Sequence, residues 1–245
     1  MLTTVWPLRQ LRLTTERLVL RPPAEDELAV LAGLAAEGVH EPGEQPFLTA
    51  WTDLPPAERA RHVMQQHWRH LGSWTQDDWE LELGVFRDGE PLGLVGLMGS
   101  EFAVLREVKT WSWLGLRHQR QGYGTEARAA LLHLAFDGLD AEAARTEVFQ
   151  DNAGSQGVSR KLGYQPDGIS RDVLHGKPVV SDRLRLTRAD WLRAEHPKVE
   201  ITGLTECRDW FAGPPADSPP TRLDGGAGCT PKPGSGWTVF VARSF

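Results

Sequence analysis

Alternating and grouped hydrophobic positions predict a series of short strands along the chain. Residues 15–21 alternate polar and apolar side chains and stop at two prolines, which predicts a first strand. Asp88 followed by Gly89 predicts a tight hairpin turn between two neighbouring strands. Further strands are predicted at residues 79–87, 91–102, 108–116, 145–150, 168–173 and 179–186.

Helical spacing of leucine and alanine predicts helices between these strands. In the first of them, residues 23–37, an acidic first turn precedes an apolar stripe. A second helix is predicted from the prolines near residue 55 to about residue 71. Two more are predicted directly after Gly122 and over residues 153–162.

The character of the chain changes after about residue 195. Residues 200–212 predict one helix or strand, and residues 213–236 are rich in Pro, Gly and Ser, which is typical of an irregular tail. Residues 237–241 predict one strand that docks back on the body. We therefore expect one domain over residues 1–195 and a C-terminal extension over 196–245.

Composition narrows the class of protein. Hydrophobic residues make up 40% of the 245, enough for a packed core, and the net charge of −6 argues against bulk nucleic-acid binding. The two cysteines, Cys207 and Cys229, form no disulfide framework, and no run is long enough to span a membrane. His62, His67 and His70 lack acidic or cysteine partners at zinc-like spacing, so no metal is expected. A cytoplasmic protein without membrane or nucleic-acid partners is the expectation.

Residues 111–128 carry the most informative local chemistry. An apolar run meets a polar turn containing Gly122 and Gly124, and the turn opens directly into a helix. Glycines let the backbone approach a ligand, and a helix N-terminus presents free N–H groups, so the pattern predicts an anion or phosphate site. Two alternatives are a dinucleotide-binding fingerprint and a turn whose glycines only relieve strain.

Residues 119–124, Gln-Arg-Gln-Gly-Tyr-Gly, match the Gln/Arg-x-x-Gly-x-Gly/Ala signature of the GNAT superfamily of acyl-CoA-dependent N-acyltransferases. The chain resembles the RimJ/RimL-like branch in particular. The order and separations agree over roughly residues 14–195, on matches at residues 15–21, 124–127, 152–155 and 161–164.

The resemblance implies an α+β fold, an αβα sandwich whose mixed, mostly antiparallel sheet splays between its fourth and fifth strands. Acetyl-CoA would lie in that split, with its pyrophosphate on the backbone amides of residues 119–125 and its pantetheine arm along residues 113–116. Arg117, His118 and Arg160 are further candidates for the phosphates. The expected coenzyme A-binding residues are Trp113, Leu114, Leu116, Gln119, Arg120, Gln121, Gly122, Tyr123, Gly124, Thr125, Asn152, Ser155 and Lys161.

The implied reaction is direct attack of a neutral amine on the acyl thioester. By resemblance, Asn152 would bind the pantetheine amides and Ser155 would protonate the departing thiolate; alternatively, both only cap the following helix. In several family members a carboxylate on the fourth strand serves as the base. This chain has Lys109 or Thr110 at the equivalent position. The candidate bases are Glu101 and Glu107, with Glu82 third, although each alone is better explained as a plain surface carboxylate.

The segment between the first helix and the second strand is expected to set acceptor specificity. Its aromatic and acidic residues would suit a cationic amine with an apolar body, although each tryptophan alone is better explained as core. They are Phe47, Trp51, Trp68, Trp74 and Trp79, with Glu41 and Glu44. We therefore expect an N-acetyltransferase acting on a small amine or a protein N-terminus, as a monomer or homodimer. The alternative is a non-catalytic acyl-CoA-binding module of the same fold.

Overall fold

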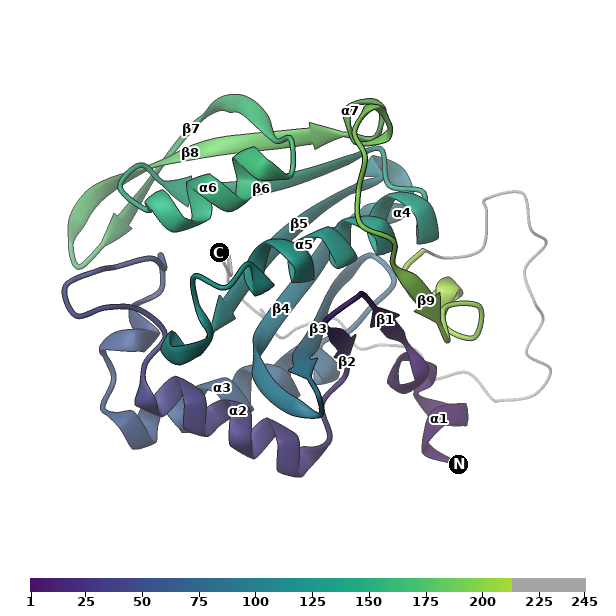
Figure 1. Ribbon diagram of the computed structural model, residues 1–245, viewed down its shortest axis with the longest axis horizontal. Helices are drawn as coiled ribbons and strands as arrows, with labels where there is room; N and C mark the ends of the chain where they lie inside the picture. Colours follow the sequence, from purple (N-terminus) through teal and green to yellow (C-terminus); the bar gives the residue numbers. More distant parts are fainter. Residues whose placement is uncertain (213–245) are drawn as a thin grey trace, which may run out of the picture.

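A computed structural model describes residues 1–212, and within them nine strands form one sheet (Figure 1). The order across the sheet is β7-β8-β6-β5-β4-β3-β2-β1-β9. Neighbours are antiparallel except β5 and β6, which are parallel. This confirms the predicted α+β class with a mixed, mostly antiparallel sheet. The strands are β1 (Arg12–Thr14), β2 (Val19–Arg21), β3 (Asp78–Arg87), β4 (Glu90–Ser100), β5 (Glu107–Leu114), β6 (Ala143–Phe149), β7 (Gln165–Leu174), β8 (Lys177–Thr187) and β9 (Glu200–Thr202).

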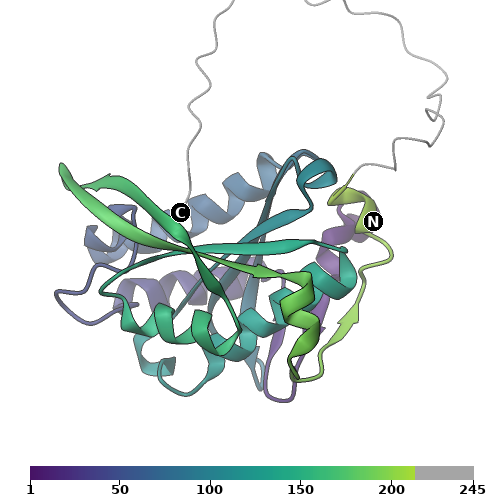
Figure 2. The ribbon, with the colours of Figure 1, turned by 90° about the horizontal axis from the view of Figure 1, so that it is seen from above.

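Helices cover both faces of this sheet. Seen from above, α2 and α3 lie on one side, and α5, α6 and α7 lie on the other (Figure 2). The α-helices are α1 (Leu2–Val5), α2 (Glu25–Glu37), α3 (Pro56–Gly72), α4 (Phe102–Leu105), α5 (Tyr123–His133), α6 (Ala153–Lys161) and α7 (Arg188–Arg193). Tighter or wider turns are η1 (Pro7–Gln10), η2 (Ala50–Asp53), η3 (Leu116–His118), η4 (Leu134–Gly138) and η5 (Arg208–Trp210).

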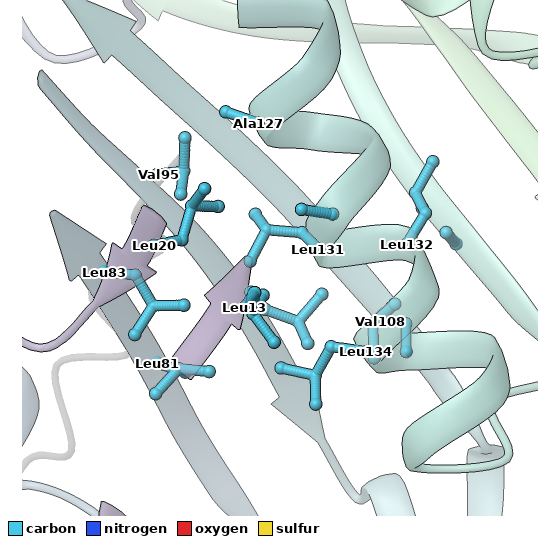
Figure 3. Close-up of a cluster of buried hydrophobic side chains, with 14 of the residues drawn as sticks. Leu13, Leu20, Leu81, Leu83, Val95, Val108, Ala127, Leu131, Leu132 and Leu134 are labelled. Atoms are coloured by element: carbon cyan, nitrogen blue, oxygen red, sulfur yellow. The ribbon is translucent and has the colours of Figure 1, made fainter. Parts of the chain in front are cut away.

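The main core lies between α5 and the sheet. Figure 3 shows Ala127 and Leu131 of α5 against leucines and valines from β1 to β5, such as Leu81 and Val95. Because side chains alternate along a strand, Leu81 and Leu83 face this core while Glu80 and Glu82 face α3. A second core lies on the opposite face of the sheet. There α2 and the segment before α3 pack on strand residues such as Leu94 and Trp113.

The sheet opens between β5 and β6. These strands pair only at Glu107–Ala143, Val108–Ala144 and Lys109–Arg145. No further pair joins them within the described residues, so residues 110–114 and 146–149 separate from one another. β5 and β6 are the fourth and fifth of the strands predicted from the sequence, which is where the family resemblance placed the opening.

Local corrections concern the ends of the predicted strands. Of the expected strand over residues 15–21, only β2 (Val19–Arg21) is strand, because the Thr15 hydroxyl accepts a hydrogen bond from the Leu18 N–H (2.9 Å) and closes a turn between β1 and β2. The strand expected to reach residue 102 ends at Ser100, since Glu101 takes a left-handed conformation (φ 49°) and starts α4.

Part of the predicted extension joins the domain. β9 pairs with β1 at the sheet edge, and Phe211 is fully buried in the main core. The irregular stretch predicted at 213–236, the strand predicted at 237–241 and Cys229 lie outside the described residues.

Candidate active site

A cavity of about 1020 Å³ occupies the opening between β5 and β6. One wall is the diverging part of β5, from Thr110 to Leu114, and the facing wall is formed by β6 and α6. The cavity continues onto the α3-facing side of the sheet, where β3 and the loop before η2 complete it. It therefore connects the N-terminus of α5 with the aromatic segment between α2 and α3.

The N-terminus of α5 opens onto this cavity. Gly122 caps the helix in a left-handed conformation (φ 85°) that disfavours other residues, and Gly122, Gly124 and Thr125 line the cavity. A Cβ added to Gly124 would meet only the Leu114 side chain, at 3.8 Å, so the space before it is free for a ligand. The Arg17–Glu126 ion pair (2.5 Å) holds this helix start against the β1–β2 turn. Free N–H groups facing an open space suit a pyrophosphate.

Some of the residues predicted in this turn line the cavity, and others hold the turn against β5. The Gln119 amide nitrogen donates to the carbonyls of Val39 (2.7 Å) and Leu114 (2.9 Å), so this side chain ties the turn to the end of β5. Arg120 is exposed, lines the cavity and has a positive φ of 61°. Trp113 and Leu114 line it from β5.

Three predicted coenzyme A-binding residues lie off the cavity wall. Tyr123 is buried in the main core, where its hydroxyl accepts a hydrogen bond from Arg87. Gln121 is exposed and donates to the Arg117 carbonyl (3.1 Å). Leu116 follows β5 in turn η3 and does not line the cavity. The contacts that the family resemblance implied for these residues use backbone atoms, and they stay a prediction.

Asn152, Ser155 and Lys161 of the α6 region line the opposite wall of the cavity. The Asn152 side-chain oxygen accepts a hydrogen bond from the Ser155 N–H (3.0 Å), so Asn152 is the N-cap of α6 and Ser155 takes part through its backbone. Capping uses the amide oxygen and leaves the amide NH₂ of Asn152 for a second partner.

Neither of the two leading candidate bases reaches the cavity. Glu107 is held by Arg145 (2.8 Å) and Arg185 (3.0 Å) at the closed end of the sheet. Glu101 is exposed beyond the end of β4. Neither carboxylate lines the cavity, because each belongs to the strand end remote from the opening.

A cluster of two carboxylates and two histidines forms the α3-facing side instead. Glu82, the third candidate, binds His67 Nδ1 at 2.6 Å and lies 3.3 Å from His70 Nδ1. Glu80 lies 3.4 Å from His70 Nε2 and accepts a hydrogen bond from the Trp111 indole (2.6 Å). Glu80, Glu82 and His70 all line the cavity. Sequence reasoning missed Glu80 and the pairing with His70, although alternation along β3 and the i, i+3 spacing of the histidines were visible signals.

The cluster has perturbed proton affinities. Burial raises the pKa of Glu80 above its ordinary value, against the opposing effects of His70 and Trp111. Burial opposes ionisation of Glu82 as well, but hydrogen bonds from His67 and His70 outweigh it and lower its pKa. For His70, burial favours the neutral form, but the carboxylates of Glu82 and Glu80 outweigh it and raise its pKa. Such a set can accept and pass on a proton.

Aromatic rings continue the wall beside this cluster. Trp51 stacks on His62 (centroids 5.7 Å apart) and contacts Phe47 (5.2 Å) and Trp113 (6.1 Å). Burial and neighbouring positive charge lower the pKa of His62, which favours its neutral form. Of the predicted acceptor residues, Phe47, Trp51 and Glu44 line the cavity. Those that do not are Glu41 and the exposed Trp68, together with Trp74 and Trp79, which pack on Phe211 in the core.

The β7–β8 hairpin reaches the loop before η2 at the rim of the cavity (Figure 1). His175 at its tip lies 3.1 Å from Asp53 and 2.9 Å from Gln45, and Gln45 lines the cavity. The two sides of the opening are thus bridged at this end.

Cys207 is a poor candidate nucleophile. It is buried in the core, and burial together with Glu206 raises the pKa of its thiol to about 12. Among the described residues, no group of three or more His, Cys, Asp or Glu side chains is arranged to hold a metal ion. In the same residues, no helix has the length and apolar character needed to cross a membrane.

The family profile described as "Acetyltransferase (GNAT) domain" matches residues 17–165. Similar solved structures include RimL, a ribosomal alpha-N-protein acetyltransferase in complex with coenzyme A (19% identity, TM-score 0.56, covering 71% of this chain and 95% of that one). Mycobacterium smegmatis RimJ, in complex with a coenzyme A disulfide, has 14% identity, TM-score 0.58 and coverages of 82% and 94%. A spermidine N-acetyltransferase SpeG chimera from Vibrio cholerae and hSSAT has 17% identity, TM-score 0.57 and coverages of 73% and 100%. These likenesses show a shared fold.

Proposed function

Because the chain belongs to the acetyltransferase (GNAT) domain family, we propose that it transfers acetyl from acetyl-CoA to a primary amine within a ternary complex. The observation that carries this proposal is the opening between β5 and β6 with the N-terminus of α5 at its mouth. In this geometry a phosphate site and an extended slot are parts of one continuous cavity. The structures of RimL and RimJ similar to this chain both hold coenzyme A in a disulfide form.

On the donor side, backbone amides at Gly122, Gly124 and Thr125 would bind the pyrophosphate. The diverging edge of β5 near Trp113 and Leu114 has no paired residue in β6 within the described residues, and the amides of the pantetheine arm would lie along it. Asn152 would donate its free NH₂ to the same arm from the facing wall. Gln119 acts as a brace that keeps the turn and the strand in register.

On the acceptor side, the amine would lie between the aromatic wall and the acidic cluster. Trp51 and Phe47 can contact an apolar body or a cation, while Glu80 attracts an ammonium group. We assign Glu80 as the proton acceptor, since its raised pKa matches a base better than an ordinary surface carboxylate does. His70, whose Nε2 lies 3.4 Å from Oε2 of Glu80, would share that proton.

The thioester supplies an activated carbonyl carbon: the amine nitrogen bonds to it, the carbon–sulfur bond breaks, and the thiolate leaves. Ser155 stands on the cavity wall as the proposed proton donor to that thiolate. Holding both reactants in one cavity supplies much of the acceleration.

The acceptor class is proposed to be a small cationic amine. The similar structures include enzymes named for ribosomal proteins and for spermidine, so both a protein N-terminus and a small amine have precedents within the fold. The bridged rim and the enclosed aromatic wall favour the small molecule, because a peptide needs an open groove.

Purified protein incubated with acetyl-CoA and a panel of amines, with free thiol followed over time, tests this proposal. Thiol release that depends on an amine, with the acetylated amine found by mass spectrometry, is expected. Tight coenzyme A binding without release under any acceptor would instead favour a non-catalytic acyl-CoA-binding module, the alternative that a missing base on β5 supports.

A further inference from the structure

Arg128 of α5 is a buried positive charge at the closed end of the β5–β6 opening. Only 4% of this residue is exposed, and it lines the cavity. Its Nη2 donates to the hydroxyls of Thr110 (2.6 Å) and Thr146 (3.1 Å), the first residues of β5 and β6 beyond their last pair. Its Nε is buried and has no hydrogen-bond partner in the described residues.

The charge of Arg128 is not neutralised by the protein around it. Within residues 1–212, no Asp or Glu carboxylate is in ion-pair contact with Arg128, whose side-chain partners are neutral hydroxyls. Glu147, which follows Thr146 on β6, has its Oε1 at 4.0 Å from Nζ of Lys109. A guanidinium in a buried site without a counter-ion is strongly disfavoured, and an anionic ligand would relieve that cost.

The position of Arg128 identifies which part of a ligand would meet it. Thr110 lies four residues from Leu114, roughly 13 Å along an extended strand, which is comparable to the length of a pantetheine arm. A donor anchored at the N-terminus of α5 and threaded along β5 would therefore point its acyl group at the wall formed by Thr110, Thr146 and Arg128. The Tyr164 hydroxyl, 3.4 Å from Thr110 Oγ1, adds another polar group there.

We propose that this wall binds a terminal carboxylate, so that the donor range extends beyond acetyl-CoA to short dicarboxylic acyl-CoA thioesters such as malonyl-CoA and succinyl-CoA. The proposal rests on the acyl-CoA site proposed above. An acetyl methyl group would leave the charge of the guanidinium uncompensated and its Nε without a partner. A carboxylate would take charge-assisted hydrogen bonds from Arg128, and guanidinium matches carboxylate geometry especially well. The chemistry at the thioester is unchanged: the N–C bond forms, the C–S bond breaks and the distal carboxylate stays intact.

Calorimetric titration of the wild-type protein with coenzyme A, acetyl-CoA and succinyl-CoA tests the proposal without any variant. Succinyl-CoA is expected to bind about tenfold or more tightly than acetyl-CoA, as one charge-assisted contact in a buried site allows. Equal or weaker binding of succinyl-CoA would overturn it. If none of the three ligands binds, the donor site itself is wrong; if acetyl-CoA binds and reacts but succinyl-CoA does not, only the carboxylate proposal fails.

Arg128→Met removes the charge while keeping an unbranched apolar stem. It is expected to abolish the preference for succinyl-CoA while free coenzyme A binds as before, and retained coenzyme A binding also shows that the site is folded. Arg128→Lys keeps a charge and should retain part of the preference. Arg171→Met, at an exposed arginine of β7, is the matched control and should change nothing. A preference that survives Arg128→Met would contradict the assignment.

Discussion

The indole Nε1 of Trp111 donates a 2.6 Å hydrogen bond to Oε1 of Glu80. Trp111 belongs to β5, the strand that diverges from β6, and Glu80 belongs to β3, two strands away. The bond therefore joins the strand beside the proposed donor arm to the proposed base. Any change that displaces the indole should alter the proton affinity of Glu80.

Glu80→Gln should remove the proton acceptor. We expect turnover to fall about 100-fold, a typical contribution of general base catalysis, with little change in coenzyme A affinity. In the wild type, the acidic limb of the rate–pH profile should have its midpoint above 4.5, because the pKa of Glu80 is raised and only its ionised form accepts a proton. Steady-state kinetics over a pH series measure both.

The same substitution at Glu101 separates the structural assignment from the one suggested by sequence. Glu101 lies outside the cavity, so Glu101→Gln should leave turnover and the pH profile unchanged. A lost acidic limb in Glu101→Gln and a normal one in Glu80→Gln would reverse the assignment.

Gly96→Ala should displace the indole ring of Trp111. Gly96 of β4 pairs with Trp111, and an added Cβ would overlap the indole ring. Overpacking of this kind costs about 1–3 kcal/mol, and we expect a lower thermal midpoint together with reduced turnover. Gly33→Ala is the matched control: a Cβ there meets nothing within 4 Å, and alanine favours the helix, so stability should hold or rise. Equal midpoints for the two variants would argue against a packed Trp111.

The acidic cluster should make stability depend on pH from both sides. The lowered pKa of Glu82 stabilises the fold fully above its ordinary value of 4.5, and this contribution is lost as the pH falls through the folded value. The raised pKa of His70 stabilises the fold below 6.5, and this contribution is lost as the pH rises through the folded value. The combined contribution is greatest between 4.5 and 6.5.

Urea unfolding at a series of pH values measures this dependence, with each unit of pKa difference worth about 1.4 kcal/mol. Glu82→Gln removes the partner of both histidines, so its unfolding free energy should vary less over the same range. If the unfolding free energy of Glu82→Gln varied with pH in parallel with that of the wild type, the ionisation of Glu82 and His70 would not be coupled to folding.

Cys207 should remain unreactive in the folded protein. With its thiol pKa raised to about 12, almost no thiolate exists at neutral pH, which argues against an acyl-cysteine intermediate at this residue. Alkylation followed by peptide mapping should find Cys207 unmodified under native conditions and modified in urea. Rapid native modification would require a different account of the core around it.

Much of the donor side could be predicted from sequence, because its chemistry is local. A glycine turn followed at once by a helix presents free backbone N–H groups that suit a phosphate, and the residues of 119–125 lie within one short segment. At Tyr123 the helix points the side chain into the core, so only its backbone could meet a ligand at this turn. A motif specifies the backbone amides more reliably than the direction of each side chain.

The acceptor side could not be predicted in the same way, because it depends on contacts between distant segments. The alternation at Glu80 and Glu82 indicates only that both carboxylates point away from the main core. Carboxylates in such a position are more typically exposed to solvent. Only the packing of α3 on β3 brings His67 and His70 to them. Likewise, the sequence does not reveal that Glu107 meets Arg145 and Arg185 at the closed end of the sheet.

Coenzyme A binding by the wild type and by Gly124→Val tests the central claim most directly. A valine there would fill the space before the α5 N-terminus, while the protein itself offers only Leu114, at 3.8 Å from the added Cβ, as a neighbour. The account predicts that the wild type binds coenzyme A, and that Gly124→Val loses about tenfold or more in affinity with a nearly unchanged unfolding midpoint. Equal affinity in the two proteins, or no binding by the wild type, would contradict it.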